Sequence, residues 1–265
     1  KVLLLRCAGF DSVDLAAAKE AGLPVLRVPA YSPESVAEQG AALLMTINRN
    51  THLGWDRTTK FNFDIAGLTG ICLAGKTAGV IGTGKIGQCM INILKGYGMK
   101  IVAYDAFPNP NLGLDYVTLD ELYAQSDVIS IHCPLMPATK HMINAEAISK
   151  MKDGVVILNF ARDLLVDDDA MEAALKSGKV KRYITDFPND KTAGMEGVVA
   201  IPHLGASTEE SEDNCAIMAA RELREYLENG NIRNSVNFPN CDMGVCNQAG
   251  RVAIFHKNIA NMITK

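Results

Sequence analysis

The sequence predicts an α/β protein built around a mainly parallel, doubly wound sheet. Short apolar runs alternate with helical patterns along most of the 265 residues, which is typical of βαβ units. The strand-like runs are continuously apolar, as expected for a sheet that helices cover on both faces. The composition fits a globular protein, since 48% of the residues are hydrophobic and 21% are charged.

The expected strands are apolar runs of three to five residues, and the expected helices show an apolar face. The strands cover residues 2–5, 25–28, 77–81, 100–104, 128–132, 155–159 and 183–185. The helices cover residues 14–20, 35–48, 86–95, 120–125, 145–150 and 168–177. A last helix is expected from Ser207, where Ser207 and Glu210 suggest a capping box, to Asn229-Gly230.

The sharpest motif is Gly82-Thr83-Gly84-Lys85-Ile86-Gly87, which follows the strand at 77–81 and opens a helix. In such a motif Gly82 permits a tight turn, Gly84 lets a pyrophosphate approach the backbone, and Gly87 allows close helix–sheet packing. Asp105 ends the next strand, 18 residues after Gly87, where a carboxylate can bind the adenosine ribose. The sequence therefore predicts a Rossmann dinucleotide-binding domain.

Composition excludes several other classes of protein. The net charge of −4 and the single Trp argue against a nucleic-acid surface, and no apolar run reaches the length of a membrane span. Seven scattered cysteines without a CxxC pair indicate reduced thiols in the cytoplasm and no zinc site. Asp167-Asp168-Asp169 is interpreted as the acidic start of a helix, so no metal is expected. The chain opens on a strand without a Met, which suggests a fragment.

Polar residues at strand ends are the candidates for chemistry, because doubly wound sheets bind ligands there. Arg162 follows the strand at 155–159 and can bind a carboxylate in bidentate fashion, or it can cap the sheet edge. His203 lies on a turn beside Gly205, where it can exchange a proton with a hydroxyl or serve structure. Asp186 is a candidate cofactor contact, and Asp190 a candidate to orient a His. His132 is expected to pack near the cofactor. The other histidines are expected to be surface or structural residues: His52, His141 and His256.

Taken together, these motifs resemble the D-isomer-specific 2-hydroxyacid dehydrogenases over essentially the whole chain. The matching pieces are Ala8-Gly9-Phe10-Asp11, Val36-Ala37-Glu38, Gly82 to Gly87, Asp105, His132-Cys133-Pro134-Leu135, Asn159-Phe160-Ala161-Arg162 and Pro202-His203-Leu204-Gly205-Ala206. The resemblance implies NAD as cofactor, Arg162 on the substrate carboxylate and His203 as the proton donor, oriented by an acid for which Asp190 is the nearest counterpart. It implies cofactor contacts at Gly82, Gly84, Lys85, Ile86, Gly87, Asp105, Cys133, Pro134, Thr139, Phe160, Ala161 and Asp186. It implies substrate contacts at Ala8, Gly9, Tyr31 and Arg162.

The resemblance also predicts the domains. Residues 1–30 would form part of a flavodoxin-like substrate domain that is incomplete, because family members carry further strands before it. Helix 208–230 is expected to pack back toward that part. Residues 31–207 would form the NAD-binding Rossmann domain, 231–250 a linker, and 251–265 the opening of a truncated ACT-like domain. The chain departs from the family pattern at two further points. Asp163 stands where many members have Gly, and the catalytic Glu of the family has no clean counterpart.

The two halves resemble different branches of the family. Residues 1–147 resemble D-lactate dehydrogenase, and the residues from about 155 on resemble D-3-phosphoglycerate dehydrogenase. We therefore expect a cytoplasmic, NAD-dependent dehydrogenase, a homodimer or higher homo-oligomer, that favours pyruvate and D-lactate. The alternatives are a D-3-phosphoglycerate dehydrogenase of serine biosynthesis and a catalytically weak NAD-binding interaction protein.

Overall fold

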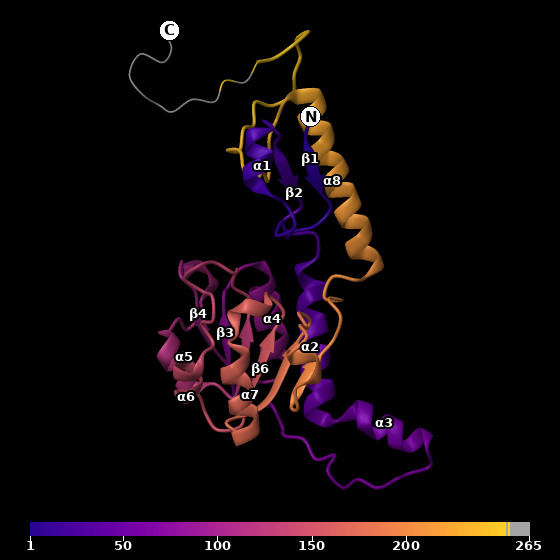
Figure 1. The fold of residues 1–265 in the computed structure, drawn as a ribbon, viewed down its shortest axis with the longest axis vertical. Helices are drawn as coiled ribbons and strands as arrows, with labels where there is room; N and C mark the ends of the chain where they lie inside the picture. The colour runs from indigo at the N-terminus through magenta and orange to yellow at the C-terminus, as the bar shows by residue number, and fades with distance from the viewer. Residues whose placement is uncertain (253, 255–265) are drawn as a thin grey trace. The chain divides into compact units, whose positions relative to one another are not determined.

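A computed structural model describes residues 1–252 and 254 of the chain and confirms the predicted α/β fold. The described residues form two compact units. Unit 2 is Ser32–Ser207, and unit 1 combines Lys1–Tyr31 with the residues from Thr208 onward. Figure 1 traces the chain through both units. Nearly all of the predicted ACT-like opening lies outside the described residues.

Unit 2 is built on a six-stranded parallel sheet with the order β4-β3-β5-β6-β7-β8. The strands are β3 (Thr77–Ile81), β4 (Lys100–Tyr104), β5 (Val128–Ile131), β6 (Val155–Asn159), β7 (Val180–Thr185) and β8 (Val198–Ala200). The chain moves from β3 outward to β4 and then returns to the other side of β3 as β5. The order therefore reverses between β3 and β5, and ligands bind parallel sheets at the carboxyl ends of such strands.

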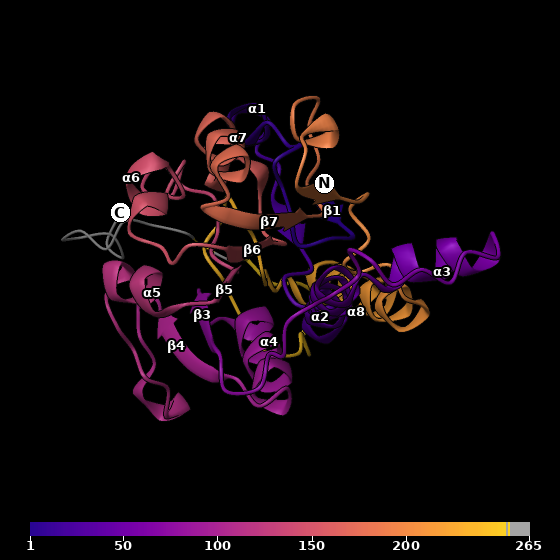
Figure 2. The same cartoon turned by 90° about the horizontal axis from the view of Figure 1, so that it is seen from below.

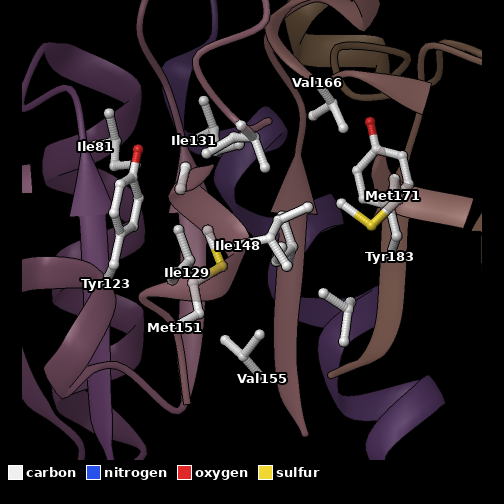
Figure 3. Close-up of a cluster of buried hydrophobic side chains, with 14 of the residues drawn as sticks. Ile81, Tyr123, Ile129, Ile131, Ile148, Met151, Val155, Val166, Met171 and Tyr183 are labelled. Atoms are coloured by element: carbon white, nitrogen blue, oxygen red, sulfur yellow. The ribbon is translucent and has the colours of Figure 1, made fainter. Parts of the chain in front are cut away.

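Helices cover both faces of this sheet, as Figure 2 shows. One face packs against α5 (Leu119–Gln125), α6 (Ala145–Ser149) and α7 (Asp168–Ser177), and Figure 3 shows part of this core. The other face packs against α2 (Pro33–Arg49) and α4 (Lys85–Gly96). Successive strand residues alternate between the two cores: Ile157 belongs to the first and Leu158 to the second. This two-sided burial explains the continuously apolar strands.

The connections in unit 2 contain short helices and one helix that the sequence did not predict. The short 3₁₀ turns are η1 (Pro110–Leu112), η2 (Asp163–Leu165) and η3 (Thr192–Gly194). The unpredicted helix is α3 (Thr51–Thr59), which has no buried residue and hence no apolar face to recognise. In Figures 1 and 2, α3 and the segment after it lie away from the sheet.

Unit 1 contains a two-stranded parallel sheet and two helices. The elements are β1 (Leu3–Leu5), α1 (Leu15–Glu20), β2 (Val25–Arg27) and α8 (Glu209–Asn229). The predicted cap of α8 is wrong by one residue, because Thr208 Oγ1 accepts from the Ser211 amide at 3.2 Å. None of the described helices is long and apolar enough to cross a bilayer.

The segment 231–250, expected as a linker, belongs to unit 1 and forms hydrogen bonds with the region of β2. The side chain of Asn237 accepts from the Val25 amide at 2.8 Å and donates to the Leu23 carbonyl at 2.9 Å. Ser235 forms an antiparallel bridge with Leu26. The polar residues that suggested a linker thus serve as hydrogen-bonding partners of β2.

Candidate active site

The glycine motif forms the turn between β3 and α4, and the structure explains two of its glycines sterically. Gly82 has φ +92°, and a Cβ there would lie 2.7 Å from the carbonyl carbon of His132. A Cβ at Gly87 would lie 2.0 Å from the Gly82 carbonyl oxygen. Neither position has room for a side chain.

The third glycine, Gly84, borders open space. A Cβ added there meets no atom within 4 Å, and no side chain caps the N-terminus of α4. The first amides of α4, from Lys85 and Ile86 to Gly87, are therefore available to an anion. This arrangement fits the pyrophosphate of NAD.

Asp105 lies directly beside the glycine motif. Its Oδ2 accepts from the Thr83 amide at 2.7 Å and from Thr83 Oγ1 at 3.0 Å, and its Oδ1 accepts from the Phe107 amide at 2.9 Å. Burial opposes ionisation of the carboxyl, but these hydrogen bonds outweigh it and lower the pKa of Asp105. The carboxylate is thus ionised and fixed at the end of β4, next to the turn.

The residues after β5 meet the glycine turn from the other side. The Cys133 amide lies 2.9 Å from where a Cβ of Gly82 would stand. Thr139 shapes the turn that follows, because its hydroxyl donates to the Pro134 carbonyl at 2.7 Å. His132 pairs its Nε2 with Ser130 Oγ at 2.8 Å, and burial lowers its pKa to about 4. Its imidazole is neutral near pH 7, in keeping with a structural role.

Asn159 organises the segment that carries Phe160, Ala161 and Arg162. Its Oδ1 accepts from the amides of Ala161 and Arg162 at 3.1 and 3.3 Å. Its Nδ2 donates to the Arg162 carbonyl at 2.8 Å and to the Tyr183 hydroxyl at 3.0 Å. Asn159 is fully buried, so it holds the chain rigidly where Arg162 leaves the sheet. Asn159 opens the motif Asn159-Phe160-Ala161-Arg162, but the sequence indicates no role for its side chain.

Phe187 brings Arg162 and His203 together. The guanidinium carbon of Arg162 lies 5.3 Å from the centre of the Phe187 ring. The His203 ring lies 4.4 Å from the same ring, centre to centre, with the planes tilted by 44°. Two residues 41 positions apart thus contact one side chain, and Phe187 is a residue that the sequence did not single out.

Asp186 is the carboxylate of this cluster. It is only 1% exposed, and both oxygens lack a hydrogen-bond partner among the described residues. Oδ2 lies 3.1 Å from where a Cβ of Gly205 would stand, so only glycine fits there without a shift. Burial raises the pKa of Asp186, while the charge of His203, the nearby amide of Gly205 and the charge of Arg162 act in the opposite direction. Such unpartnered buried oxygens fit a site that a ligand completes.

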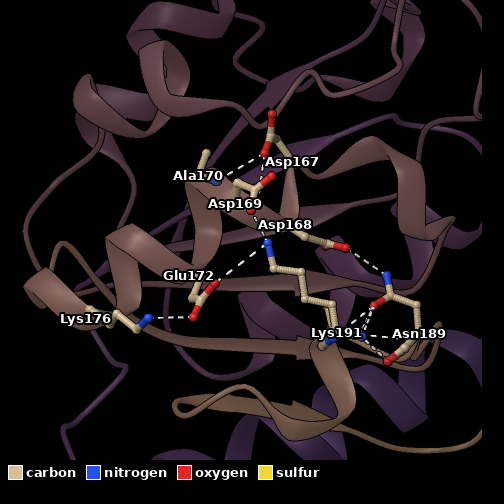
Figure 4. A network of polar contacts seen from close by, with 9 residues as sticks. Asp167, Asp168, Asp169, Ala170, Glu172, Lys176, Asn189 and Lys191 are labelled. Atoms are coloured by element: carbon tan, nitrogen blue, oxygen red, sulfur yellow. Dashed lines mark hydrogen bonds and ion pairs between the residues drawn. The ribbon is translucent and has the colours of Figure 1, made fainter.

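Asp190, the acid expected to orient His203, lies elsewhere. It is exposed, and no hydrogen bond or ion pair joins it to His203 in the part of the chain that the structure describes. Its neighbours are fixed to α7 instead, as Figure 4 shows. Lys191 pairs with Asp169, and Asn189 donates to Asp168 at 2.8 Å. The structure therefore does not support the expected Asp190–His203 pair.

Figure 4 also shows the contacts of the three consecutive acids, Asp167, Asp168 and Asp169. Asp167 caps α7, because its Oδ1 accepts from the amides of Asp169 and Ala170 at 3.0 and 3.1 Å. This confirms their interpretation as the start of a helix. The three acids have separate partners, and no group of three or more metal-ligating side chains occurs in the described ranges.

The expected substrate contacts outside Arg162 belong to unit 1. The Ala8 carbonyl accepts from Arg27 Nη1 at 2.6 Å, and Gly9 follows it. Tyr31 packs with Val28 and Cys215. Their role toward a substrate stays a prediction.

Comparison with known proteins identifies the family. Residues 41–205 match the family model described as the D-isomer specific 2-hydroxyacid dehydrogenase, NAD binding domain. A D-lactate dehydrogenase of Escherichia coli is 52% identical over 183 residues, 68% of this chain and 56% of that protein. A 2-hydroxyacid dehydrogenase homolog of Haemophilus influenzae is 55% identical over 183 residues, 68% of this chain and 55% of that protein. The matches thus span little more than half the length of these relatives.

Solved structures agree with this result. The apo-structure of D-lactate dehydrogenase from E. coli has a TM-score of 0.82 at 43% identity, covering 89% of this chain and 78% of that one. A D-lactate dehydrogenase from Aquifex aeolicus, complexed with NAD and lactic acid, has a TM-score of 0.80 at 33% identity, covering 91% and 81%. This chain belongs to the D-isomer-specific 2-hydroxyacid dehydrogenase family, and NAD is the cofactor of the domain that it shares with that family.

Proposed function

We propose that this chain is an NAD-dependent oxidoreductase that interconverts a 2-oxo acid and a D-2-hydroxy acid, with pyruvate and D-lactate preferred. The observation that carries the proposal is the contact of both Arg162 and His203 with the Phe187 ring. It puts a carboxylate-binding guanidinium and a proton-exchanging imidazole beside one side chain, as a 2-oxo acid requires. The D-lactate dehydrogenases among the relatives support lactate.

In this proposal each polar residue has one task. Arg162 binds the substrate carboxylate, and His203 protonates the carbonyl oxygen during reduction. Asp186 replaces Asp190 as the acid that attracts the protonated imidazole, because its charge and that of His203 interact. NAD, once bound, supplies or accepts the hydride. The open backbone at Gly84 would take its pyrophosphate, and Asp105 its adenosine ribose.

The test is oxidation of NADH with pyruvate, 3-phosphohydroxypyruvate and a panel of 2-oxo acids. Arg162→Ala should lose at least about thirtyfold in kcat/KM for every accepted acid, since a buried carboxylate would lose its partner. Arg182→Ala, at an exposed position on β7, is the matched control. Preference for the phosphorylated acid would favour 3-phosphoglycerate as the substrate. Binding of NADH without turnover of any acid would contradict the proposed activity and favour a cofactor-binding interaction protein.

His203, Asp186 and Asp190 are tested in the same assay. His203→Asn should lose about 10²–10⁴ in rate, the usual contribution of a general acid. His141→Asn is its control, because His141 has φ +51° and Asn tolerates that conformation. Asp186→Asn should slow reduction about tenfold or more. Asp190→Asn should leave it unchanged, and the reverse result would restore Asp190 as the partner of His203.

We further propose that the chain forms a homodimer through α3 and the segment after it. Large apolar side chains are exposed there: Leu53 by 43%, Trp55 by 72%, Phe61 by 87%, Phe63 by 75% and Ile65 by 82%. Apolar surface gathered in this way marks an interaction site. Trp55→Glu should give a monomer in sedimentation velocity, whereas Phe107→Ser, at an even more exposed position after β4, should not. A monomeric wild-type protein would contradict this interface.

The seven cysteines, all unpaired in the structure, support a reducing compartment such as the cytoplasm. Detection of the mature protein in an oxidising compartment by cell fractionation would contradict this location.

A further inference from the structure

Two cysteines of unit 1 lie close together although they are 208 positions apart. Cys7 follows β1 and is exposed, and its thiol donates to the Gly9 carbonyl at 3.2 Å. Cys215 lies on α8 and is only 3% exposed. It packs with Val28 and Ala219 in the small core of this unit.

One hydrogen bond sets an upper limit on the distance between the Cys215 sulfur and Cys7. The sulfur of Cys215 lies 2.7 Å from the carbonyl oxygen of Arg6, the residue bonded to Cys7. Standard peptide dimensions put that oxygen about 2.8 Å from the Cys7 Cα, so the Cys215 sulfur lies within about 5.5 Å of that atom. A disulfide requires Cα atoms about 4.4–6.8 Å apart, and the upper limit is compatible with that separation. The Cys7 side chain must rotate away from Gly9 for its sulfur to reach that of Cys215.

Nearby charges are consistent with this geometry. Burial is the main cause that raises the pKa of Cys215; Arg6 lowers it, and a Cys7 thiolate raises it further. Tyr31 responds to both sulfurs: burial raises its pKa, and so do thiolates at Cys215 and Cys7. The two thiols therefore share one small neighbourhood, at one end of α8.

We propose that Cys7 and Cys215 are a reversible thiol–disulfide site, oxidised by a low-molecular-weight disulfide such as oxidised glutathione. The exposed Cys7 thiolate attacks the disulfide, forms a mixed disulfide and releases one glutathione thiolate. The Cys215 thiolate, formed by loss of a proton to solvent, then attacks the Cys7 sulfur and releases the second glutathione. In balance, two protein thiols and one oxidised glutathione give one protein disulfide and two reduced glutathiones.

The bond would connect the end of β1 covalently to α8. Cys7 directly precedes Ala8 and Gly9, so oxidation would restrict the segment expected to contact the substrate. This disulfide does not depend on the proposed function, because its formation is measured on the protein itself and not through turnover of a substrate.

The experiment is peptide mapping of the folded full chain after incubation with oxidised glutathione. We expect one linked pair of peptides, containing Cys7 and Cys215, that dithiothreitol separates. In Cys215→Ser, Cys7 should instead accumulate as the glutathione adduct, because the resolving thiol is gone. In Cys7→Ser, Cys215 should stay free, since it is buried. Cys72→Ser removes another exposed thiol and should leave the linked pair unchanged.

The wild-type protein alone decides the outcome, so a variant that fails to fold does not affect the test. Circular dichroism of the oxidised sample checks that it is folded. Wild-type Cys7 found only as the glutathione adduct, with Cys215 free, would overturn the proposal. A link from Cys7 to any other cysteine would overturn it as well.

Discussion

Asn159 offers the sharpest test of how the site is held, through the change Asn159→Ala. The substitution removes four hydrogen bonds, of which the one to the Tyr183 hydroxyl is fully buried. A buried polar group left without a partner costs about 1–3 kcal/mol. The other three bonds join half-buried main-chain groups that water can reach, and each contributes about 0.5 kcal/mol, at the low end for a net hydrogen bond. Together these contributions predict a loss of about 2.5–4.5 kcal/mol in the free energy of unfolding.

Two assays separate stability from positioning. Urea unfolding measures the free energy of unfolding, and Tyr183→Phe, which removes only one of the four bonds, should lose about 1 kcal/mol. Because Arg162 shifts with its segment, kcat/KM for the 2-oxo acid should fall about tenfold to a hundredfold in Asn159→Ala. The Kd of NADH should rise as well, because the segment that Asn159 holds includes Ala161, an expected cofactor contact. An unfolding free energy within about 0.5 kcal/mol of wild type would refute this account of the residue.

Three further predictions follow from the cofactor turn. Asp105→Ala should reduce the preference for NADH over NADPH, which should be at least about tenfold in the wild type because the carboxylate repels a 2′-phosphate; equal use of both by the wild type would refute its role. Gly87→Ala should weaken NADH binding in titration calorimetry, because its Cβ would lie 2.0 Å from the Gly82 oxygen; unchanged affinity would contradict that contact. The pKa of His132 falls from 6.5 to about 4 on folding, so the unfolded chain binds a proton first. The free energy of unfolding should therefore decline as pH falls from about 6.5 to 4, and it should decline less steeply in His132→Gln. Parallel pH profiles for the wild type and the variant would contradict the lowered pKa of His132.

Much of the sheet could be predicted because burial on both faces leaves a continuous apolar run. Thr77–Ile81, Lys100–Tyr104 and Val155–Asn159 occur as expected. The helix α3 could not be predicted in this way, because its apolar residues are exposed and follow no helical period. The start of α8 was misplaced because Ser207 and Thr208 are both good capping residues, and sequence alone does not choose between them.

The candidate site could be proposed from polar residues that follow strand ends, such as Arg162 and His203, and both of these contact Phe187 in the structure. Phe187 was missed because its role depends on contacts with residues distant in sequence. Asn159 was missed because a polar residue at the end of an apolar strand gives no hint of which main-chain groups it will bind. Exposure could not be predicted either: Asp190 is exposed whereas Asp186 is buried, and spacing along the chain does not encode this difference.

The division of the chain into units has a consequence for biosynthesis. Unit 2 is one continuous stretch, whereas unit 1 joins residues on both sides of it. The ribosome therefore completes unit 2 before α8 exists, and domains generally fold as units during synthesis. Until the residues after α8 emerge, β2 lacks its hydrogen-bonding partners Ser235 and Asn237, although Val25 and Leu26 are fully buried in the finished fold. We expect chaperones to bind this protein at β1 and β2, and a ribosome stalled before Thr208 to carry a folded unit 2 while β1 and β2 are still unfolded.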